Sequence, residues 1–160
     1  MYLDNVRQQY EQYPYPPRAP EDERRRLLEV LMDRLALINF YCFQGKHTFE
    51  GARVLVGGGG TGDSTIYLAE QLREKQGEVV YVDISSASLE IARERAAVRK
   101  LDNIRFIHGS LLALKADEVG EFDYISCTGV LHHLDDPLAG LRALKSVLKP
   151  NGGMGLLLYA

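Results

Sequence analysis

Between Arg53 and Leu72 the chain reads RVLVGGGGTGDSTIYLAEQL: a short apolar run leads into four consecutive glycines and then into a helix-like pattern. Backbone without Cβ atoms is needed where another group must come very close to it. A carboxylate, Asp83, follows roughly twenty residues after the glycines, at the end of the next apolar run. This combination predicts a loop that holds a nucleotide-like ligand, with Asp83 accepting hydrogen bonds from the two vicinal hydroxyls of a ribose.

Residues 57–62 fit more than one glycine template. From Gly57 they match GxGxxG, the fingerprint of dinucleotide-binding proteins, and from Gly58 they match GxGxG. A tight strand–helix turn without any ligand is a third interpretation. Asp63, which opens the next helix, favours a ligand without phosphates, because a pyrophosphate at that helix start would lie beside a fixed negative charge. A cofactor with ammonium and sulfonium groups would tolerate this carboxylate.

Composition limits the class of protein. The 160 residues suit a single domain, and 46% apolar and 26% charged residues are typical of ordinary soluble proteins. A net charge of −3 gives no general reason to expect nucleic acid or an anionic membrane as partner. Cys42 and Cys127 are too few for a disulfide framework and lack metal-ligand spacing, so we expect no metal site and a cytoplasmic location. No apolar run approaches membrane-spanning length.

From residue 51 onward, the pattern alternates between strand and helix. Strands are predicted over five short runs: residues 53–56, 79–82, 104–107, 122–126 and 153–159. Helices are predicted between them, over residues 64–76, 86–100 and 137–148, the last with Asp136 as its N-cap. This alternation predicts an α/β fold with a doubly wound, mostly parallel sheet and helices on both faces. The glycine loop then lies at the switch point where the winding reverses.

Residues 1–50 are predicted to form a separate N-terminal segment. Four prolines in YPYPPRAP, residues 13–20, forbid a regular helix and favour an extended path. The following run, residues 21–43, has apolar positions at steps of three and four and predicts one long amphipathic helix.

The leader, residues 1–20, is rich in tyrosine and has two open interpretations. As a lid, Tyr10, Tyr13 and Tyr15 would close over the ligand, with Arg18 available to a carboxylate. As a packing arm, the leader would lie on the sheet edge or on a neighbouring subunit.

From Arg53 onward, the chain resembles the class I S-adenosylmethionine-dependent methyltransferases. Their first three motifs resemble VLVGGGGTGDSTIYLA, VVYVDISSASLEIARERA and DNIRFIHGSLLAL. Farther on, LHHL at residues 131–134 is paired with LKPNGG at residues 148–153, a combination that dinucleotide dehydrogenases do not show. The resemblance implies a Rossmann-like fold and S-adenosylmethionine as cofactor. It leaves the methyl acceptor unidentified.

The resemblance also implies the cofactor contacts. The glycine loop would pass the methionine part, Asp83 would hold the ribose and Ile84 would pack on the adenine. Two residues after the third strand would meet the adenine edge, and three at the end of the fourth would line the methyl and amino groups. Together with Gly57, Gly59 and Asp63, which the loop pattern itself adds, the full set of expected contacts is Gly57, Gly58, Gly59, Gly60, Gly62, Asp63, Asp83, Ile84, Ser110, Leu111, Cys127, Thr128 and Gly129.

Some positions depart from the family pattern. Val56 stands where an acidic residue usually helps to hold the ammonium group, and Ser110 where an aspartate commonly binds the adenine amino group. Losing two carboxylates should weaken cofactor affinity, because charge-assisted hydrogen bonds are stronger than neutral ones. Asp63 is a possible replacement for the first. A non-catalytic cofactor-binding or assembly module is therefore an alternative, and an NAD(P)-binding oxidoreductase domain is a less favoured one.

Methyl transfer from a sulfonium requires collinear positioning rather than a nucleophilic side chain or a metal. A general base is needed only when the acceptor is protonated at working pH. His132 and His133 are the candidate bases, although we expect one to pack in the turn and the other to face solvent. Cys127 has no basic neighbour in the sequence and is interpreted as a pocket-lining residue.

The last predicted strand ends close to residue 160. Class I methyltransferases usually continue with another helix and two strands, so the unit at residues 51–160 is expected to lack its last strands. An apolar edge strand invites association. We therefore expect either a homo-oligomer, formed through this strand or the N-terminal segment, or a longer protein of which this chain is a piece.

Overall fold

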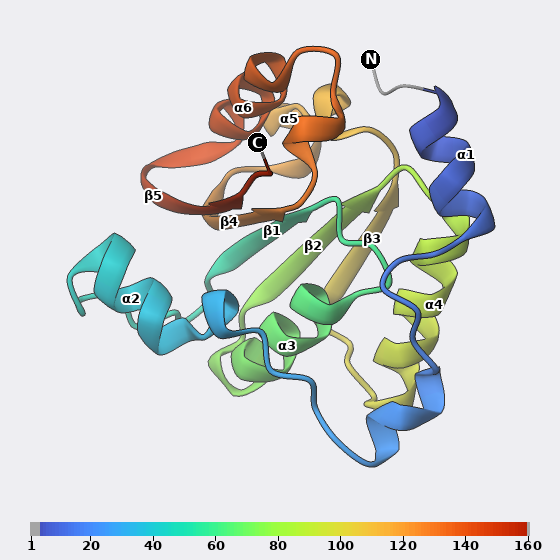
Figure 1. Ribbon diagram of the computed structural model, residues 1–160. Coiled ribbons are helices and arrows are strands. Elements are labelled where there is room, and N and C mark those ends of the chain that lie inside the picture. The colour runs from blue at the N-terminus through green and yellow to red at the C-terminus, as the bar shows by residue number, and fades with distance from the viewer. Residues whose placement is uncertain (1–3, 160) are drawn as a thin grey trace.

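Residues 4–159, described by a computed structural model, form a five-stranded parallel sheet in the order β3-β2-β1-β4-β5 (Figure 1). The five predicted strands are confirmed. Their bounds are β1 (Arg53–Gly57), β2 (Glu78–Asp83), β3 (Ile104–His108), β4 (Phe122–Thr128) and β5 (Leu148–Leu157). Residues 1–3 and 160, which belong to the predicted N-terminal and sheet segments, lie outside the described residues.

Helices cover both faces of the sheet, as the alternation predicts (Figure 1). One face carries α2 (Leu35–Phe43), α3 (Asp63–Leu72) and α4 (Ser86–Val98), with the 3-10 turn η3 (Arg73–Lys75) after α3. The other carries η4 (Leu111–Ala113), α5 (Ala116–Val119), η5 (Leu131–His133) and α6 (Pro137–Ser146). Asp136 caps α6 as predicted, its carboxylate accepting a hydrogen bond from Leu138 N at 2.9 Å. Strand β1 lies between β2 and β4, so the winding reverses there and a crevice opens at the carboxyl ends of these strands.

The predicted long helix over residues 21–43 is wrong. After α1 (Asp4–Gln12), the chain forms two short 3-10 turns, η1 (Pro20–Arg24) and η2 (Leu31–Asp33), and becomes α-helical only at α2. Partners far along the chain explain the break: Glu23 is buried against α4, and Gln71 of α3 donates a hydrogen bond to the carbonyl oxygen of Asp33. The expected apolar stripe is split accordingly, because Leu31 is 64% exposed whereas the α2 residues Leu35 and Ile38 are buried.

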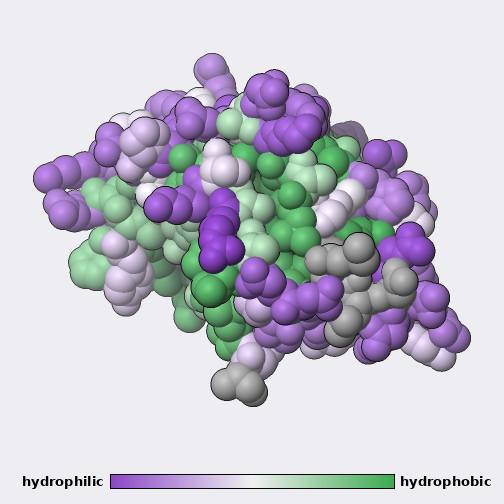
Figure 2. Space-filling model, turned by 90° about the horizontal axis from the view of Figure 1, so that it is seen from above, coloured by the Kyte–Doolittle hydropathy of each residue, from purple (hydrophilic) through white to green (hydrophobic). Residues whose placement is uncertain are grey.

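Large apolar side chains remain exposed on α2 and after β5. They include Phe40, Tyr41, Leu158 and Tyr159. Seen from above, apolar side chains gather at the centre of the molecule and hydrophilic ones surround them (Figure 2).

Among residues 4–159, no helix is long and apolar enough to cross a membrane.

Candidate functional site

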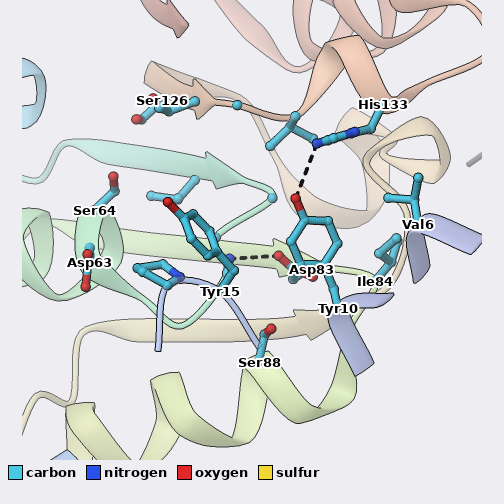
Figure 3. Close-up of a pocket in the computed structure, with 18 of the residues that line it drawn as sticks. Val6, Tyr10, Tyr15, Asp63, Ser64, Asp83, Ile84, Ser88, Ser126 and His133 are labelled. Atoms are coloured by element: carbon cyan, nitrogen blue, oxygen red, sulfur yellow. Dashed lines mark hydrogen bonds between the residues drawn. The ribbon is translucent and has the colours of Figure 1, made fainter. Parts of the chain in front are cut away.

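A cavity of about 540 Å³ lies at the carboxyl ends of β1, β2 and β4. Its size is in the range of small-molecule sites. Its walls come from the glycine loop (Gly58–Gly60), the end of β2 (Asp83 and Ile84), the turn after β4 (Thr128–Val130), the two histidines of η5, and the leader (Figure 3). The crevice predicted from strand order is therefore present, with the glycine loop in it.

The glycine loop is packed against the protein as well as against the cavity. A Cβ on Gly59 would lie 2.3 Å from the ring of Tyr81, whose hydroxyl donates a hydrogen bond to Gly60 O at 2.7 Å. Gly60 has a φ of +52°, and its Cβ would lie 2.7 Å from the carbonyl oxygen of Tyr15. The bare backbone thus makes room for an internal ring and for the leader, in addition to any ligand.

Asp83 ends β2 and is fixed to the glycine loop. Its Oδ2 accepts a hydrogen bond from Gly60 N at 2.7 Å, and its Oδ1 accepts one from Ser85 N at 2.8 Å. Burial raises the pKa of Asp83, and these N–H donors partly offset the rise. A carboxylate oxygen accepts more than one hydrogen bond, so the oriented group keeps capacity for ligand hydroxyls.

Asp63 has a different environment from the one expected. Its carboxylate accepts hydrogen bonds from Arg18 at 2.9 and 2.6 Å and from Arg95 at 2.7 Å. Burial opposes ionisation, but the two guanidiniums lower the pKa of Asp63 below its ordinary value. Because two cations already neutralise this carboxylate, it is poorly suited to replace the acid missing at Val56. For the same reason, Asp63 would repel a phosphate group at this helix start less strongly than the sequence alone predicts.

The leader lies over the cavity. The rings of Tyr10 and Tyr15 stand on either side of Asp83 (Figure 3). Hydrogen bonds hold the leader there, from Thr61 Oγ1 to Pro16 O at 2.6 Å and from Ser85 Oγ to Tyr10 O at 3.1 Å. Arg18, which the lid interpretation makes available to a carboxylate, already pairs with Asp63 of the chain itself. Tyr13, the third tyrosine of the lid interpretation, is 65% exposed and does not line the cavity, so the choice between a lid and a packing arm stays a prediction.

Glu11 of the leader caps the start of α4. Its carboxylate accepts hydrogen bonds from Ser86 N at 2.6 Å, Ser86 Oγ at 3.1 Å and Ala87 N at 3.2 Å. A carboxylate at a helix N-terminus is favoured because the first N–H groups of the helix lack partners within it. The leader is therefore joined to α4 next to the Asp83 end of the cavity.

Both candidate histidines line the cavity and are half-buried, so neither lies apart from the site. Tyr10 Oη lies 3.3 Å from His133 Nε2 (Figure 3), and the two histidine rings are 4.1 Å apart. Burial and the neighbouring His132 lower the pKa of His133, which favours its neutral form. His132 Nδ1 is buried and has no hydrogen-bond partner among residues 4–159.

The structure brings together only part of the predicted contact set. Gly58, Gly59, Gly60, Asp63, Asp83, Ile84, Thr128 and Gly129 line the cavity. Gly57, Gly62, Ser110, Leu111 and Cys127 do not.

Each of the residues outside the cavity wall has a structural position instead. Leu111 and Cys127 are buried in the apolar core on the α6 face, where Gly57 abuts Cys127. Gly62 allows close packing with α4, since its Cβ would lie 2.9 Å from that of Ala92. Ser110 Oγ accepts a hydrogen bond from Leu112 N at 3.2 Å and so caps η4.

Sequence reasoning missed several wall residues, among them Val6, Val30, Ser64, Ser88, Ser126 and Tyr159. Ser126 alone had a detectable signal, because it is a polar residue inside the apolar run of β4. Val30 and Ser64 could not be found this way, since their position depends on how η2 and α3 pack.

The comparisons with known proteins agree on one family. A family model described as a methyltransferase domain matches residues 55–154. An uncharacterized protein of Synechococcus sp. is 38% identical over 152 residues, which cover 94% of this chain and 36% of the relative. A ubiquinone biosynthesis O-methyltransferase of Albidiferax ferrireducens is 31% identical over 132 residues, which cover 82% of this chain and 49% of the relative. The chain thus spans less than half the length of these curated relatives.

Solved structures show the same likeness. The structure of PKMT2 from Rickettsia typhi in complex with AdoHcy has a TM-score of 0.59 and 29% identity, covering 66% of this chain and 20% of that one. Another structure of PKMT2 has a TM-score of 0.68 and 26% identity, covering 87% of this chain and 26% of that one.

Proposed function

Because the chain belongs to the methyltransferase-domain family, we propose that its cavity binds S-adenosylmethionine and that the protein transfers the methyl group to an acceptor. The observation that carries this proposal is the oriented carboxylate of Asp83. It lies against the glycine loop, at the carboxyl end of β2, in a cavity large enough for a nucleoside with an amino-acid tail.

The residues of the cavity fit the parts of this cofactor. Asp83 would hold the ribose hydroxyls, and Ile84, next along the chain, would pack on the adenine. Thr128 and Gly129, with the glycine loop, would contact the methionine part. When bound, S-adenosylmethionine supplies a methyl group on a sulfonium, which an acceptor takes by in-line displacement.

The chain's own contribution is to orient the cofactor and the acceptor within the cavity. Collinear alignment of acceptor, methyl carbon and sulfur is the main requirement of such a displacement, and orientation alone supplies several kcal/mol or more. Tyr10 and Tyr15 line the cavity on its leader side. His133, held near Tyr10 and favoured in its neutral form, is placed to accept a proton when the acceptor carries one.

Isothermal titration calorimetry tests the proposal. The protein should bind S-adenosylmethionine and S-adenosylhomocysteine, and NAD should give no heat of binding. Asp83→Asn should weaken S-adenosylhomocysteine at least about tenfold, because hydrogen bonds to a charged group contribute about 1.5–3 kcal/mol. Asp117→Asn, which makes the same change on the exposed helix α5, is the matched control and should leave affinity unchanged.

Binding of NAD in place of S-adenosylhomocysteine would overturn the proposal. Methyl transfer itself is checked by incubating the protein and labelled S-adenosylmethionine with a cell extract. Label should appear in an extract compound with the wild-type protein and be lost with Asp83→Asn.

A further inference from the structure

Asp33, at the end of η2, is an unusual carboxylate. Its exposed fraction is 1%, and neither carboxylate oxygen has a hydrogen bond of ordinary geometry to any residue from 4 to 159. Burying an ionised carboxylate without a partner costs several kcal/mol, so such groups are rare unless something pairs with them.

The carboxyl lies behind the wall of the cavity. The hydroxyls of Ser64 on α3 and Ser126 on β4 face it, and both serines line the cavity. Figure 3 shows Ser64 and Ser126 at one end of the cavity, with Val6 and Ile84 at the other. Val56, also in the wall, is the register neighbour of Ser126, so the carboxyl of Asp33 approaches the part of the sheet where β1 and β4 lie side by side.

The segment that carries Asp33 is held in place. Gln71 on α3 donates a hydrogen bond to Asp33 O at 2.9 Å and accepts one from Leu35 N at 3.0 Å. These two bonds fix the backbone on both sides of Arg34. The buried carboxyl is therefore an oriented group rather than the result of a loose turn.

The chain itself supplies no cation to this carboxyl within the described residues. The nearest cation in sequence, Arg34, pairs with the exposed Glu29 at 2.5 Å. The ionisable group facing Asp33 from β4 is the buried phenol of Tyr124, which is neutral at ordinary pH. Burial raises the pKa of Asp33, and the hydroxyls of Ser64 and Ser126 offset part of the rise.

We propose that Asp33 binds the ammonium group of the cofactor's amino-acid end, between Ser64 and Ser126. The inference rests on the proposed function, since it needs S-adenosylmethionine in the cavity. An ammonium group provides three N–H donors and a positive charge. The two unpaired carboxylate oxygens of Asp33 need both, because they are hydrogen-bond acceptors that carry a negative charge when ionised. A sulfonium carries a charge but no donor and satisfies the site less well. Asp33 thereby supplies, from the N-terminal segment, the carboxylate that the sheet lacks at Val56.

The test compares two ligands on two proteins by titration calorimetry. One ligand is S-adenosylhomocysteine, and the other is the analogue in which hydrogen replaces its amino group. Asp33→Asn should weaken S-adenosylhomocysteine about tenfold or more. It should change the affinity of the deamino analogue less than about twofold, because this ligand has no ammonium group to lose. Glu29→Gln, which removes one exposed negative charge from the same segment, should change neither.

A second measurement needs only the wild-type protein. Burial raises the pKa of Asp33, and an ammonium beside the carboxyl would lower it again, so binding should release protons to the buffer as the pH is brought down into the range where Asp33 titrates. Calorimetry in buffers of different ionisation enthalpy should detect this release with S-adenosylhomocysteine and a smaller one with the deamino analogue. It decides the matter even if Asp33→Asn fails to fold.

The outcomes separate the two proposals. Equal losses for both ligands in Asp33→Asn, or equal proton release, would overturn the role of Asp33 while leaving the methyltransferase proposal intact. Binding of neither ligand to the wild-type protein would overturn both.

Discussion

Glu23 and Asp33 are both acidic residues that the N-terminal segment brings into the interior, ten positions apart, and their environments are opposite. Glu23 accepts hydrogen bonds from Arg95 Nε at 2.9 Å and Nη2 at 2.6 Å, and it also pairs with Arg99. Arg95 in turn contacts Asp63. Asp33 is as deeply buried and has no such partner in the described part of the chain.

The difference separates a structural charge from a ligand-binding one. The guanidinium of Arg95 repays part of the desolvation of Glu23 in the folded protein itself. Among residues 4–159, Asp33 has no cation that plays this part, and only the hydroxyls of Ser64 and Ser126 face it. A paired buried carboxylate should therefore matter most for stability, and an unpaired one beside a cavity should matter most for affinity.

The largest expected effect is on stability, when the buried ion pair of Glu23 is broken. Arg95→Met removes the buried partner that Glu23 and Asp63 share and leaves each carboxylate with one other arginine, Arg99 and Arg18 respectively. It should lower the free energy of unfolding by about 3 kcal/mol, the lower end of the cost of breaking a buried ion pair. Urea denaturation followed by circular dichroism measures this loss. Arg93→Met, on the same helix but with a side chain 51% exposed, is the control and should cost less than about 1 kcal/mol. An equal loss in the free energy of unfolding for the two variants would show that the ion pair of Glu23 with Arg95 contributes no special stability.

An intermediate effect of opposite sign is expected for Asp33. Its folded-state pKa is raised above the ordinary value of 3.8, so its stabilising contribution is present below that value and is lost as pH rises through the folded-state pKa. Without ligand, Asp33→Asn should therefore be more stable than wild type at neutral pH, by about 1 kcal/mol, and the gap should close in acid. Urea titrations from neutral to acidic pH measure the gap.

Asp63→Asn is the matched control, because it should change the free energy of unfolding at neutral pH in the opposite direction. The pKa of Asp63 is lowered, so its contribution to stability is present above the ordinary value and is lost as pH falls through the folded-state pKa. Asp63→Asn should thus be less stable than wild type at neutral pH. The same sign for both variants would contradict the contrast drawn between a paired and an unpaired carboxylate.

The smallest expected effect concerns a third carboxylate, Glu11, which is close to solvent and caps α4 from the leader. Glu11→Gln should lower the free energy of unfolding by less than about 1 kcal/mol. Hydrogen exchange of the leader amides between residues 10 and 16 should nevertheless become faster, because one of the leader's attachments weakens. Glu21→Gln, an exposed acid in η1, should not change that exchange. Unchanged leader exchange in Glu11→Gln would mean that the other contacts hold the leader alone.

The elements from residue 51 onward could be predicted because each is defined by a local pattern. Strand β2 is an apolar run, and α6 begins with an acidic cap followed by proline. Asp83 could be placed as well, since the end of a parallel strand beside a glycine loop has a fixed relation to the crevice. The segment from residue 21 to 43 could not be predicted. Its amphipathic spacing is real, but Glu23 finds its partner 72 positions away, and that contact excludes a continuous helix.

By itself, the sequence determined the order of strands and helices from residue 51 onward, the glycine loop with Asp83 and, through the resemblance, the family. Hydrophobic periodicity, turn residues and motif spacing are short-range properties, so they can be recognised without knowing which residues lie across the sheet. Only the tertiary structure decided which charges are paired. It placed two arginines on Asp63, none on Asp33 among the described residues, and the leader over the cavity. The reason is that electrostatic pairing depends on distance in space and on burial, and neither quantity is contained in spacing along the chain.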